Sequence, residues 1–476
     1  MTQIKQLSKL SANEPLVILL DSSDLKSSKQ FNASELEVLK AASLNKKQHV
    51  LLHEKGQLKL FVIHDGKSGW ELSEFMRKAG AKVCGIINEH HHERVCIQSA
   101  HAAMLLPFAE GMALANYQFI KYKTKAKANT LKQIGILSKG IQETELEKLN
   151  VVVESTCIAR DLVNEPFSHL NSLQISEAFK HLGKKAGFEV EVWNEAKIEA
   201  QKMGGLLSVN RASKIPPTFN IMSYKPKNAQ NKKPYVLVGK GVVYDTGGLS
   251  LKPTPNSMDH MKCDMAGAAV VGGVMYAIAK LKLPIYVVGL VPATDNWIGE
   301  NSYAPGDVIT MYSGTTVEIL NTDAEGRLIL ADALHFAKKL KPELVCDFAT
   351  LTGAAVRAIG SYATAVMGNA DDSVKQSVFE SSYAVFERLV EFPLWQEYAD
   401  ELKSEVADMT NLGKGEGGQI SAAKFLEHFT DYPWMHFDIA GPAFNDHADA
   451  YKPKGGTGVG VRLMVDFLSK QATKKK

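Results

Sequence analysis

Acidic and basic side chains of the kind that hold metal ions gather in three short segments of the second half of the chain. The segments read VGKGVVYDTGGLSLK, MKCDMAGAA and NTDAEGRL, at residues 238–252, 261–269 and 321–328. Their carboxylates belong to Asp245, Asp264, Asp323 and Glu325. Four carboxylates brought together are costly to bury unless cations balance them, and two divalent ions would do so in formal charge.

Oxygen ligands without His or Cys beside them suit Mg²⁺ or Mn²⁺, and Zn²⁺ also accepts carboxylates. Two such ions ~3.5–4 Å apart can activate a water and polarise a carbonyl together. The DxExR pattern of Asp323, Glu325 and Arg327 would, by itself, favour a solvated loop with a local salt bridge. The additional carboxylates of Asp245 and Asp264 make a two-metal site the better interpretation.

Two lysines accompany these carboxylates. Positive charge nearby disfavours an ammonium group, so Lys240 beside two metal ions would become a neutral amine able to bind one of them. Lys252, slightly further away, would stay charged. The alternative is a phosphate-binding loop, because GKG followed by a glycine pair is glycine-rich. The segment does not match GxxxxGK[ST], and such a loop alone is a weak signal.

The elements that must position these side chains alternate between short apolar runs and amphipathic segments, which predicts an α/β fold. Asp323 and Glu325 would share one face of an extended segment, with Arg327 beginning a helix. Ligands of open parallel sheets bind beyond the carboxyl ends of the strands, where these segments are expected. The predicted strands of this region are Tyr235–Gly239, Ile285–Val291, Val317–Leu320, Leu344–Phe348 and Met435–Ile439.

The first third of the chain predicts a second, smaller α/β domain. Its expected strands are Leu16–Leu20, Val50–His53, Leu60–His64 and Val83–Ile87, and its expected helices include Ser34–Ala42 and Trp70–Ala79. A longer helix is expected over Thr144–Val163, and Pro166 cannot continue it. We therefore predict an N-terminal domain at residues 1–165, and a catalytic domain at 166–476 with a mixed, largely parallel sheet flanked by helices.

Composition bounds the class of protein. The 476 residues include 55 Lys and Arg against 52 Asp and Glu, a formal charge of +3, which is too small to make nucleic acid the expected main partner. The longest apolar run, Met265–Ala279, is shorter than the ~20 residues that cross a bilayer. Five scattered cysteines without a CxxC pair fit a reducing compartment. The expectation is a cytoplasmic protein without membrane spans.

Two histidine-containing segments have plainer interpretations than metal binding. The EHHHE run at residues 89–93 cannot direct all its side chains at one ion from a helix or strand, so a solvated turn is expected. His436 is expected to be a hydrogen-bonded histidine within the sheet.

At the three acidic segments the sequence resembles the leucine aminopeptidase family, the two-metal peptidases of family M17. NTDAEGRL is that family's signature octapeptide, and it is unbroken here. The resemblance spans roughly residues 159–463. It also includes ARDLVNEP, GKGVVYDTGGLSLKP, MKCDMAGAA, DFATLTGA and WMHFDIAGPA, at residues 159–166, 239–253, 261–269, 347–354 and 434–443.

This resemblance implies a role for each site residue. Asp245 and Glu325 would bridge the two metals, Lys240 and Asp264 would complete the tightly held ion, and Asp323 the exchangeable one. Lys252 would hold the substrate carbonyl and the developing oxyanion. Arg327 would hold a bicarbonate ion as general base, which fits the lack of a spare His or Glu in the three segments. Zn or Mn is the expected metal, with Mg or Co also possible.

The resemblance also implies the substrate and the assembly. The free α-amine of a peptide would bind one metal, so that only the first residue is released. Met261, Thr350, Leu351 and Gly353 would line the pocket for that residue's side chain. An apolar pocket separates side chains by only ~1–3 kcal/mol per methylene, which predicts a broad preference for Leu and similar residues. A homohexamer is expected.

Two features depart from the family pattern, and two rival functions stay open. Thr246 stands where Ser is expected, and the loop Pro253–Met261 is one residue longer, which bears on the placement of Asp264. One rival is a DNA-binding regulator, against which the near-neutral charge argues. The other is a metal-dependent phosphohydrolase, which could use the same carboxylates.

Overall fold

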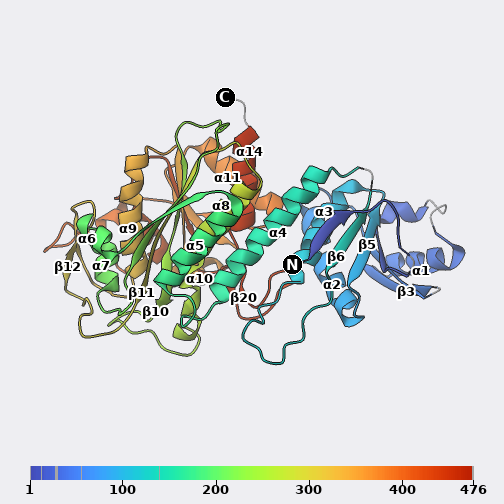
Figure 1. Ribbon diagram of the computed structural model, residues 1–476, viewed down its shortest axis with the longest axis horizontal. Helices are drawn as coiled ribbons and strands as arrows, with labels where there is room; N and C mark the ends of the chain where they lie inside the picture. The colour runs from blue at the N-terminus through green and yellow to red at the C-terminus, as the bar shows by residue number, and fades with distance from the viewer. Residues whose placement is uncertain (1, 12, 27–30, 55, 139, 474–476) are drawn as a thin grey trace. The chain divides into compact units, whose positions relative to one another are not determined.

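The computed structural model describes residues 2–11, 13–26, 31–54, 56–138 and 140–473, which form two compact units (Figure 1). The first unit comprises Met1–Glu154 and His447–Lys454. The second comprises Ser155–Asp446 and Gly455–Lys476. The division between them lies inside helix α4 (Glu143–Asn164), upstream of the boundary expected near Pro166.

The first unit is built around one sheet with the strand order β1-β6-β5-β2-β4-β3. Neighbouring strands are parallel except for the antiparallel edge strand β3. The strands are β1 (Gln3–Gln6), β2 (Leu16–Asp21), β3 (His49–Glu54), β4 (Gln57–His64), β5 (Arg94–Ser99) and β6 (Gln133–Leu137). The helices are η1 (Ser22–Lys26), α1 (Ala33–Leu44), α2 (Gly69–Glu89) and α3 (Ala102–Ala115).

One predicted strand of this unit is wrong. Val83–Ile87 lies within α2, where Val83, Cys84 and Ile87 are buried. Cys84 and Ile87 are three residues apart and Val83 and Ile87 are four apart, so they lie on one side of a helix. A short apolar run cannot be assigned to strand or buried helix by its pattern alone, and here α2 continues past the expected end at Ala79. The other expected strands and helices of this unit are present at the expected places.

The second unit has a mixed sheet whose centre is parallel. The strand order is β16-β15-β18-β14-β9-β11-β8-β7, and β10 pairs with β11. Strands β18, β14, β9, β11 and β10 run parallel, so their carboxyl ends lie at one edge. This confirms the predicted fold class.

The bounds of its strands are as follows: β7 (Glu189–Trp193), β8 (Thr218–Tyr224), β9 (Tyr235–Gly239), β10 (Gly241–Asp245), β11 (Val287–Asn296), β12 (Val308–Thr310), β13 (Thr316–Glu318), β14 (Leu344–Ala349), β15 (Thr364–Gly368), β16 (Leu389–Glu391), β17 (Met409–Thr410), β18 (Trp434–Asp438), β19 (Phe444–Asn445) and β20 (Gly455–Gly456). Its helices are α5 (Ser172–Ala186), α6 (Glu195–Ala200), α7 (Gly204–Asn210), η3 (Met258–Met265), α8 (Ala266–Lys280), α9 (Glu325–Ala337), η4 (Lys338–Leu340), α10 (Gly353–Ile359), α11 (Asp372–Val385), α12 (Gln396–Asp400), α13 (Gly418–Glu427) and α14 (Val461–Thr473).

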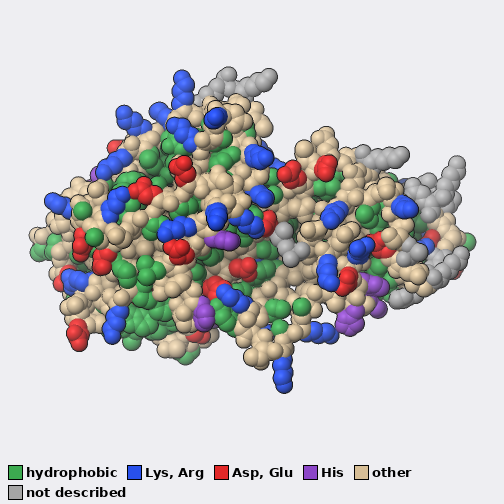
Figure 2. All heavy atoms as spheres, viewed as in Figure 1, with side chains coloured by type: hydrophobic (Ala, Val, Ile, Leu, Met, Phe, Trp, Pro, Cys, Tyr) green, Lys and Arg blue, Asp and Glu red, His purple; other side chains and the backbone are tan. Residues whose placement is uncertain are grey.

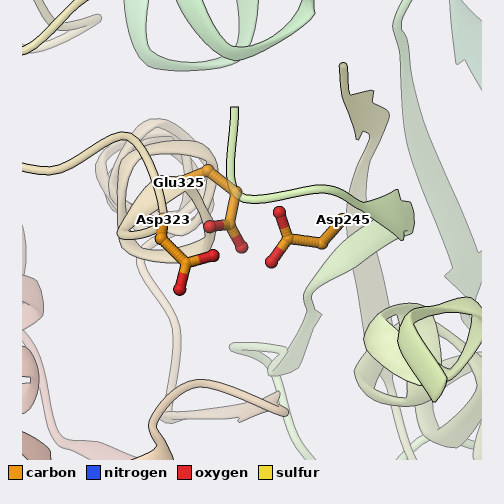
Figure 3. Close-up of side chains that lie close together, drawn as sticks. All are labelled: Asp245, Asp323 and Glu325. Atoms are coloured by element: carbon orange, nitrogen blue, oxygen red, sulfur yellow. The ribbon is translucent and has the colours of Figure 1, made fainter. Parts of the chain in front are cut away.

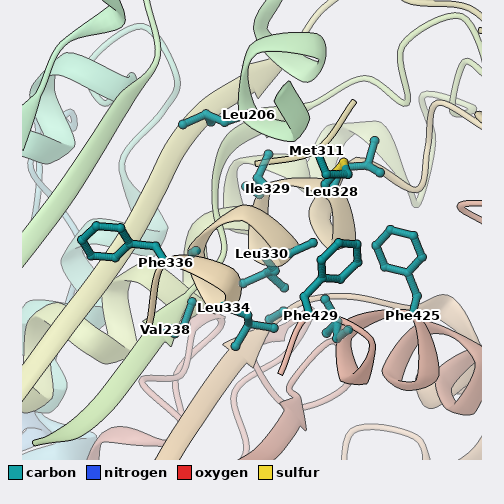
Figure 4. Packing of buried hydrophobic residues seen from close by; sticks show 14 of the residues in the cluster. Leu206, Val238, Met311, Leu328, Ile329, Leu330, Leu334, Phe336, Phe425 and Phe429 are labelled. Atoms are coloured by element: carbon teal, nitrogen blue, oxygen red, sulfur yellow. The ribbon is translucent and has the colours of Figure 1, made fainter. Parts of the chain in front are cut away.

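Helices cover both faces of this sheet, with α5 and α8 on one face and α7 and α9 on the other (Figure 1). The core on the α9 side is formed by side chains of that helix and of elements around it (Figure 4). Leu328, Ile329, Leu330 and Leu334 are fully buried there against residues such as Val238. Burying each such side chain stabilises the fold by about 1.5–3 kcal/mol, so α9 is held firmly at the edge where the acidic segments meet.

Helix α8 explains the longest apolar run of the sequence. Together with η3 it forms a helical stretch, Met258–Lys280, that is long and apolar enough to cross a membrane by length and composition. Its most apolar window is 89% buried inside the protein, which is typical of a core helix. Gly267 allows the close packing, because a Cβ there would lie 1.9 Å from the carbonyl oxygen of Phe348 in β14.

The surface carries both signs of charge. On the face in Figure 2, Lys and Arg side chains are interspersed with those of Asp and Glu. Of the five cysteines, Cys84, Cys96, Cys263 and Cys346 are buried.

Candidate metal centre and active site

The acidic segments converge at the carboxyl edge of the parallel strands. Asp245 is the last residue of β10, and Glu325 is the first residue of α9. Asp323 lies in the turn before α9, so Asp323 and Glu325 do not share the extended segment that the sequence predicts. A carboxylate at the first position of a helix is favoured by the helix dipole, which explains why Glu325 rather than Arg327 begins α9.

Three carboxylates form the centre of the site. One ligand atom from each of Asp245, Asp323 and Glu325 lies within 4.8 Å of the others. The carboxylates point toward one another in Figure 3, Asp245 from one side and the other two from the start of α9. Asp245 and Glu325 are buried, while the side chain of Asp323 is 32% exposed. The arrangement leaves Asp323 as the member nearest to solvent.

Two lysines connect the carboxylates, including Asp264, in pairs. The Nζ of Lys240 lies 2.8 Å from carboxylate oxygens of both Asp264 and Glu325, and it donates to the carbonyl oxygen of Thr350. The Nζ of Lys252 lies 2.9 Å from Asp245 Oδ2 and forms a second ion pair with Asp323. Asp264 itself comes from η3, directly before α8, rather than from the first turn of the helix. All four predicted carboxylates and both lysines therefore belong to one connected cluster.

The electrostatics of the cluster follow from its burial and its surplus of negative charge. Burial would lower the pKa of Lys240, but Asp264, Glu325 and Asp245 outweigh it and raise this pKa. The pKa of Lys252 is raised in the same way, chiefly by Asp245. Burial raises the pKa of Asp323 to about 7, with Asp245 and Glu325 adding to the shift. The pKa of Asp264 is also raised by burial, against the effect of Lys240.

The residues present fit divalent metal ions. Glu325 Oε2 is buried and accepts no hydrogen bond from the described residues. Asp264 Oδ2 lies near Lys240 but outside hydrogen-bond geometry. A buried carboxylate oxygen without a donor is costly. Four carboxylates against two ammonium groups leave a formal charge of −2, so added cations would stabilise the cluster.

Residues that the sequence analysis did not single out hold the cluster in place. Asn296, the last residue of β11, is fully buried and donates from Nδ2 to Asp245 Oδ1 at 2.8 Å and to the carbonyl oxygen of Thr322 at 3.0 Å. Thr322 in turn donates to the carbonyl oxygen of Gly247 and accepts from the amide of Ser250. Asn296 thus joins the segment that carries Asp245 to the segment that carries Asp323.

The glycine pair has a steric role in this junction, and no bound phosphate is needed to explain it. Gly247 and Gly248 have φ values of +85° and +61°, which favour glycine. A Cβ on Gly248 would lie 2.9 Å from Thr322 Oγ1, and one on Gly247 would lie 2.9 Å from Asp323 Oδ1. The pair lets the loop after β10 approach the turn before α9.

Arg327 lies behind the carboxylates. Its Nη1 donates to the carbonyl oxygen of Asn411 at 2.8 Å, whereas its buried Nε has no acceptor among the described residues. Burial lowers the pKa of Arg327 to about 10, against the opposing effect of Glu325 and Asp438. Asn411 is fully buried and also holds the start of the NTDAEGRL segment. Its Oδ1 accepts from the amide of Leu320, and its Nδ2 donates to the carbonyl oxygen of Asn321.

The residues expected to line the substrate pocket lie beyond β14 and in η3. Thr350 donates from Oγ1 to Asp264 Oδ1 at 2.7 Å, so it is attached to the cluster directly. The amide of Leu351 donates to Asp438 Oδ1, and Gly353 begins α10 at an exposed position. Met261 is a partly exposed residue of η3, three positions before Asp264.

The histidines expected to be outside the site are outside it. His436 in β18 is fully buried, and its Nδ1 lies 2.6 Å from Asp347 Oδ1 on the neighbouring strand. This agrees with a hydrogen-bonded histidine within the sheet. The EHHHE run lies at the end of α2 and in the turn that follows, where His91 has φ +58°.

Known proteins are similar to this chain in sequence, and they share one family. A family model described as the cytosol aminopeptidase family, catalytic domain, matches residues 157–465. A probable cytosol aminopeptidase of Chlorobium limicola is 45% identical over 389 residues, which are 78% of this chain and 76% of the relative. A probable cytosol aminopeptidase of Geobacter sulfurreducens is 40% identical over 433 residues, covering 88% of this chain and 87% of the relative.

Solved structures are similar over nearly the whole chain. The bottromycin maturation enzyme BotP in complex with Mn has a TM-score of 0.86 and 30% identity, covering 97% of this chain and 100% of that one. A mutant of tomato leucine aminopeptidase has a TM-score of 0.88 and 27% identity, covering 99% and 97%. The matched region contains every residue of the carboxylate and lysine cluster. The chain belongs to the cytosol aminopeptidase family and is a metal-dependent aminopeptidase of that family.

Proposed function

We propose that this protein is a two-metal aminopeptidase that releases the first residue of peptides and prefers Leu and other apolar residues. The observation that carries the proposal is the convergence of Asp245, Asp323 and Glu325 within 4.8 Å, with Asp264 joined to them through Lys240. These residues lie far apart in the sequence, and the fold brings them to one edge of a parallel sheet, where ligands of such sheets bind.

The metal ligands would be the five residues named from the sequence. Asp245 and Glu325 are the most buried carboxylates of the central group, and both would hold the ions. Lys240 and Asp264 would complete one site, and Asp323, the more exposed carboxylate, would serve the more exchangeable ion. When bound, the ions supply Lewis acidity that activates a water and polarises the scissile carbonyl.

Lys252 and Arg327 would assist from either side. The Nζ of Lys252 is held at the edge of the cluster by Asp245 and Asp323, so its positive charge is fixed where negative charge develops on a carbonyl oxygen. The buried Nε of Arg327 has no acceptor in the part of the chain that the structure describes, which suits an anion such as bicarbonate. Arg327 would hold that anion, which would supply a general base, since no histidine belongs to the cluster.

Substrate selection would come from the segment after β14 and from η3. Met261, Thr350, Leu351 and Gly353 are the proposed lining for the first side chain of the peptide. Thr350 is bonded to Asp264, so the pocket and the metal ligands would share one rigid frame. Zn or Mn is the proposed metal, and the Mn in the BotP complex supports the latter. A cytoplasmic homohexamer, assembled with the help of the first unit, completes the proposal.

Release of p-nitroaniline from Leu-p-nitroanilide tests the activity. We expect turnover after loading with Mn²⁺ or Zn²⁺, and little turnover after chelation. Glu325→Gln should reduce kcat by at least about 10³-fold, because it removes one negative charge and one oxygen ligand from the centre. Near-normal turnover of this variant would contradict the site assignment. Phosphatase turnover without peptidase activity would contradict the function itself.

A further inference from the structure

The segment that supplies most of the proposed substrate pocket runs from the end of β14 to the start of α10. This pocket segment, residues 350–353, contains Thr350, Leu351 and Gly353 of the proposed lining. Thr350 Oγ1 donates to Asp264 Oδ1 at 2.7 Å, and the carbonyl oxygen of Thr350 accepts from Lys240 Nζ at 2.9 Å. These contacts tie the first residue of the pocket segment to the proposed metal ligands.

Asp438 holds the next two residues of the pocket segment. It is the last residue of β18 and is paired in register with Ala349, the last residue of the parallel strand β14. Asp438 Oδ1 accepts from the amide of Leu351 at 3.1 Å, and Asp438 Oδ2 accepts from the hydroxyl of Thr352 at 2.7 Å. One carboxylate at a strand end therefore fixes two consecutive residues that follow the neighbouring strand.

The contact with Asp438 extends into helix α10 through Thr352. The Oγ1 of Thr352 donates to Asp438 and accepts from the amide of Ala355 at 3.1 Å, so Thr352 caps the start of α10. A side-chain cap fixes the place where a helix begins, because it satisfies an amide that has no partner within the helix. The position of Gly353, the first residue of α10, thus depends on Asp438 through Thr352.

The side chain of Asp438 is itself held in one orientation. It is 1% exposed, and its Oδ1 also accepts from the amide of Ala440 at 3.1 Å. Burial raises the pKa of Asp438, and His436 and the hydroxyl of Thr352 oppose this shift. Hydrogen bonds donated to a carboxylate favour its charged form. Asp438 is therefore a fixed acceptor, and its orientation is set by its own strand and the turn that follows it.

Loss of this acceptor would free the pocket segment at one end. The amide of Leu351 and the hydroxyl of Thr352 would need new partners, and the segment would shift to find them. Thr350 would stay attached to Asp264, so the rest of the pocket would move relative to the proposed metal ligands. Selection between apolar side chains depends on how well each one fills its pocket, so such a shift would change the preference for the first residue.

We propose that Asp438 is a positioning residue that sets the selectivity for the first residue of the peptide, by holding Leu351 and Thr352 in place relative to the metal ligands. Asp438 acts through the pocket segment. The inference rests on the proposed function, because it takes the pocket segment as the lining for the first side chain.

The ratio of kcat/KM for Leu-p-nitroanilide to kcat/KM for Ala-p-nitroanilide tests the proposal in the full chain loaded with Mn²⁺. We expect Asp438→Ala to lower this ratio by at least about fivefold, because the shifted pocket fits the larger side chain less well. Asp438→Asn should keep the ratio within about twofold of wild type, since its amide oxygen still accepts from Leu351 and its Nδ2 can donate to Thr352 Oγ1.

A second pair of variants tests the same contact if Asp438→Ala does not fold. Thr352→Val removes the hydroxyl that joins Asp438 to α10, and we expect it to lower the ratio by at least about threefold. Thr352→Ser keeps the hydroxyl and should stay within about twofold of wild type.

Asp332→Ala is the matched control for the loss of a buried carboxylate. Asp332 in α9 is also 1% exposed, and it accepts from the amides of Leu206 and Tyr312 at 3.0 and 2.9 Å. Its replacement should reduce stability and leave the ratio unchanged. Asp438 also opposes the lowering of the pKa of Arg327. An effect passed through Arg327 would change the turnover of both substrates alike, so the ratio excludes it.

The outcomes separate this inference from the proposed function. Equal losses for both substrates in Asp438→Ala and Thr352→Val, with unchanged ratios, would show a merely structural role and overturn the inference alone. Absence of turnover of both substrates by wild type would contradict the proposed function and the inference with it. A lowered ratio in Asp438→Ala or Thr352→Val, restored in the matching Asn or Ser variant, would support the inference.

Discussion

At the scale of single residues, the site depends on side chains that touch the carboxylates without carrying charge. Asn296 donates to both Asp245 and the carbonyl oxygen of Thr322. The side chain of Asn411 accepts from the amide of Leu320 and donates to the carbonyl oxygen of Asn321, just before Asp323. A neutral amide can hold a carboxylate in one orientation without cancelling the charge that a metal needs. Replacing a hydrogen-bond partner of this kind typically lowers metal affinity or activity by about 10–100-fold.

Asn296→Ala should therefore lower kcat/KM by about 10–100-fold, because Asp245 loses a charge-assisted hydrogen bond worth ~1.5–3 kcal/mol. Steady-state kinetics at saturating metal would measure the loss, and raised metal concentration should recover part of it. Asn231→Ala is the matched control, since Asn231 is also a buried asparagine that bonds main-chain carbonyls, but near β11's other end. An Asn296 variant as active as the Asn231 variant would show that Asn296 does not position Asp245.

At the scale of elements, the site exists because two helices begin close to strand ends. Helix α9 begins with Glu325 and Gly326. Gly326 lies against the side chain of Lys240, the residue that directly follows β9. A Cβ on Gly326 would lie 2.5 Å from Lys240 Cε and 2.7 Å from Nζ. Helix α8 approaches the same strand end through Gly267, where a Cβ would lie 2.8 Å from the amide nitrogen of Lys240. Small residues at these helix starts let Lys240 lie between Asp264 and Glu325.

Gly326→Ala should displace the Lys240 side chain and reduce kcat by at least about tenfold, with a stability cost on the order of 1–3 kcal/mol from overpacking. Activity and thermal unfolding together measure the two effects. Gly85→Ala provides the comparison, because a Cβ on Gly85 in α2 would contact nothing within 4 Å. That substitution should keep full activity and stabilise by about 0.4–1 kcal/mol. Full activity of Gly326→Ala would contradict the tight packing around Lys240.

At the scale of the whole molecule, stability is expected to depend on both metal and pH. The cluster of four carboxylates and two lysines keeps a formal surplus of negative charge inside the second unit. Ions that bind the folded chain and not the unfolded chain stabilise the folded state by mass action. The first unit has its own source of pH dependence, since the buried Nε2 of His49 has no hydrogen-bond partner among the described residues.

Chelation of divalent ions should lower the unfolding temperature by roughly 5–15 °C, and adding Mn²⁺ or Zn²⁺ back should restore it. Differential scanning calorimetry on the full chain measures the change. In Glu325→Gln the effect of chelation should be much smaller, because the centre binds metal less tightly. If the chelator left the unfolding temperature of wild type unchanged, this would argue against tightly held ions.

Acid should destabilise the chain partly through His49. Burial, with help from Lys82, lowers the pKa of His49 to about 4, whereas an unfolded histidine titrates near ~6.5. Because the folded pKa is the lower one, the unfolded state binds more protons between these values, and stability falls as the pH drops from about 6.5 to about 4. His49→Gln should show a smaller drop in unfolding temperature between pH 7 and pH 4.5. His181→Gln should retain the full drop, and equal drops in all three proteins would exclude His49 as the cause.

Local sequence determined the chemistry and most of the elements. The acidic segments, their lysines and the strands before them are visible because side-chain type and apolar periodicity are properties of short stretches. Only Val83–Ile87 among the expected strands is helical, since five apolar residues satisfy either period. The sequence does not predict that the two units divide inside α4, or that His447–Lys454 belongs to the first unit. Neither feature changes the local amino-acid composition.

The tertiary structure alone decided how the site is assembled. Asn296 meets Asp245 across 51 positions, and Arg327 meets Asn411 across 84. Asp21 and His64 meet only because β2 and β4 are neighbouring strands of their sheet. Such contacts depend on which strands pair and where helices begin, and these are set by packing over the whole chain. The sequence therefore identifies the reactive side chains. Long-range packing determines the distances between them, their burial and their protonation.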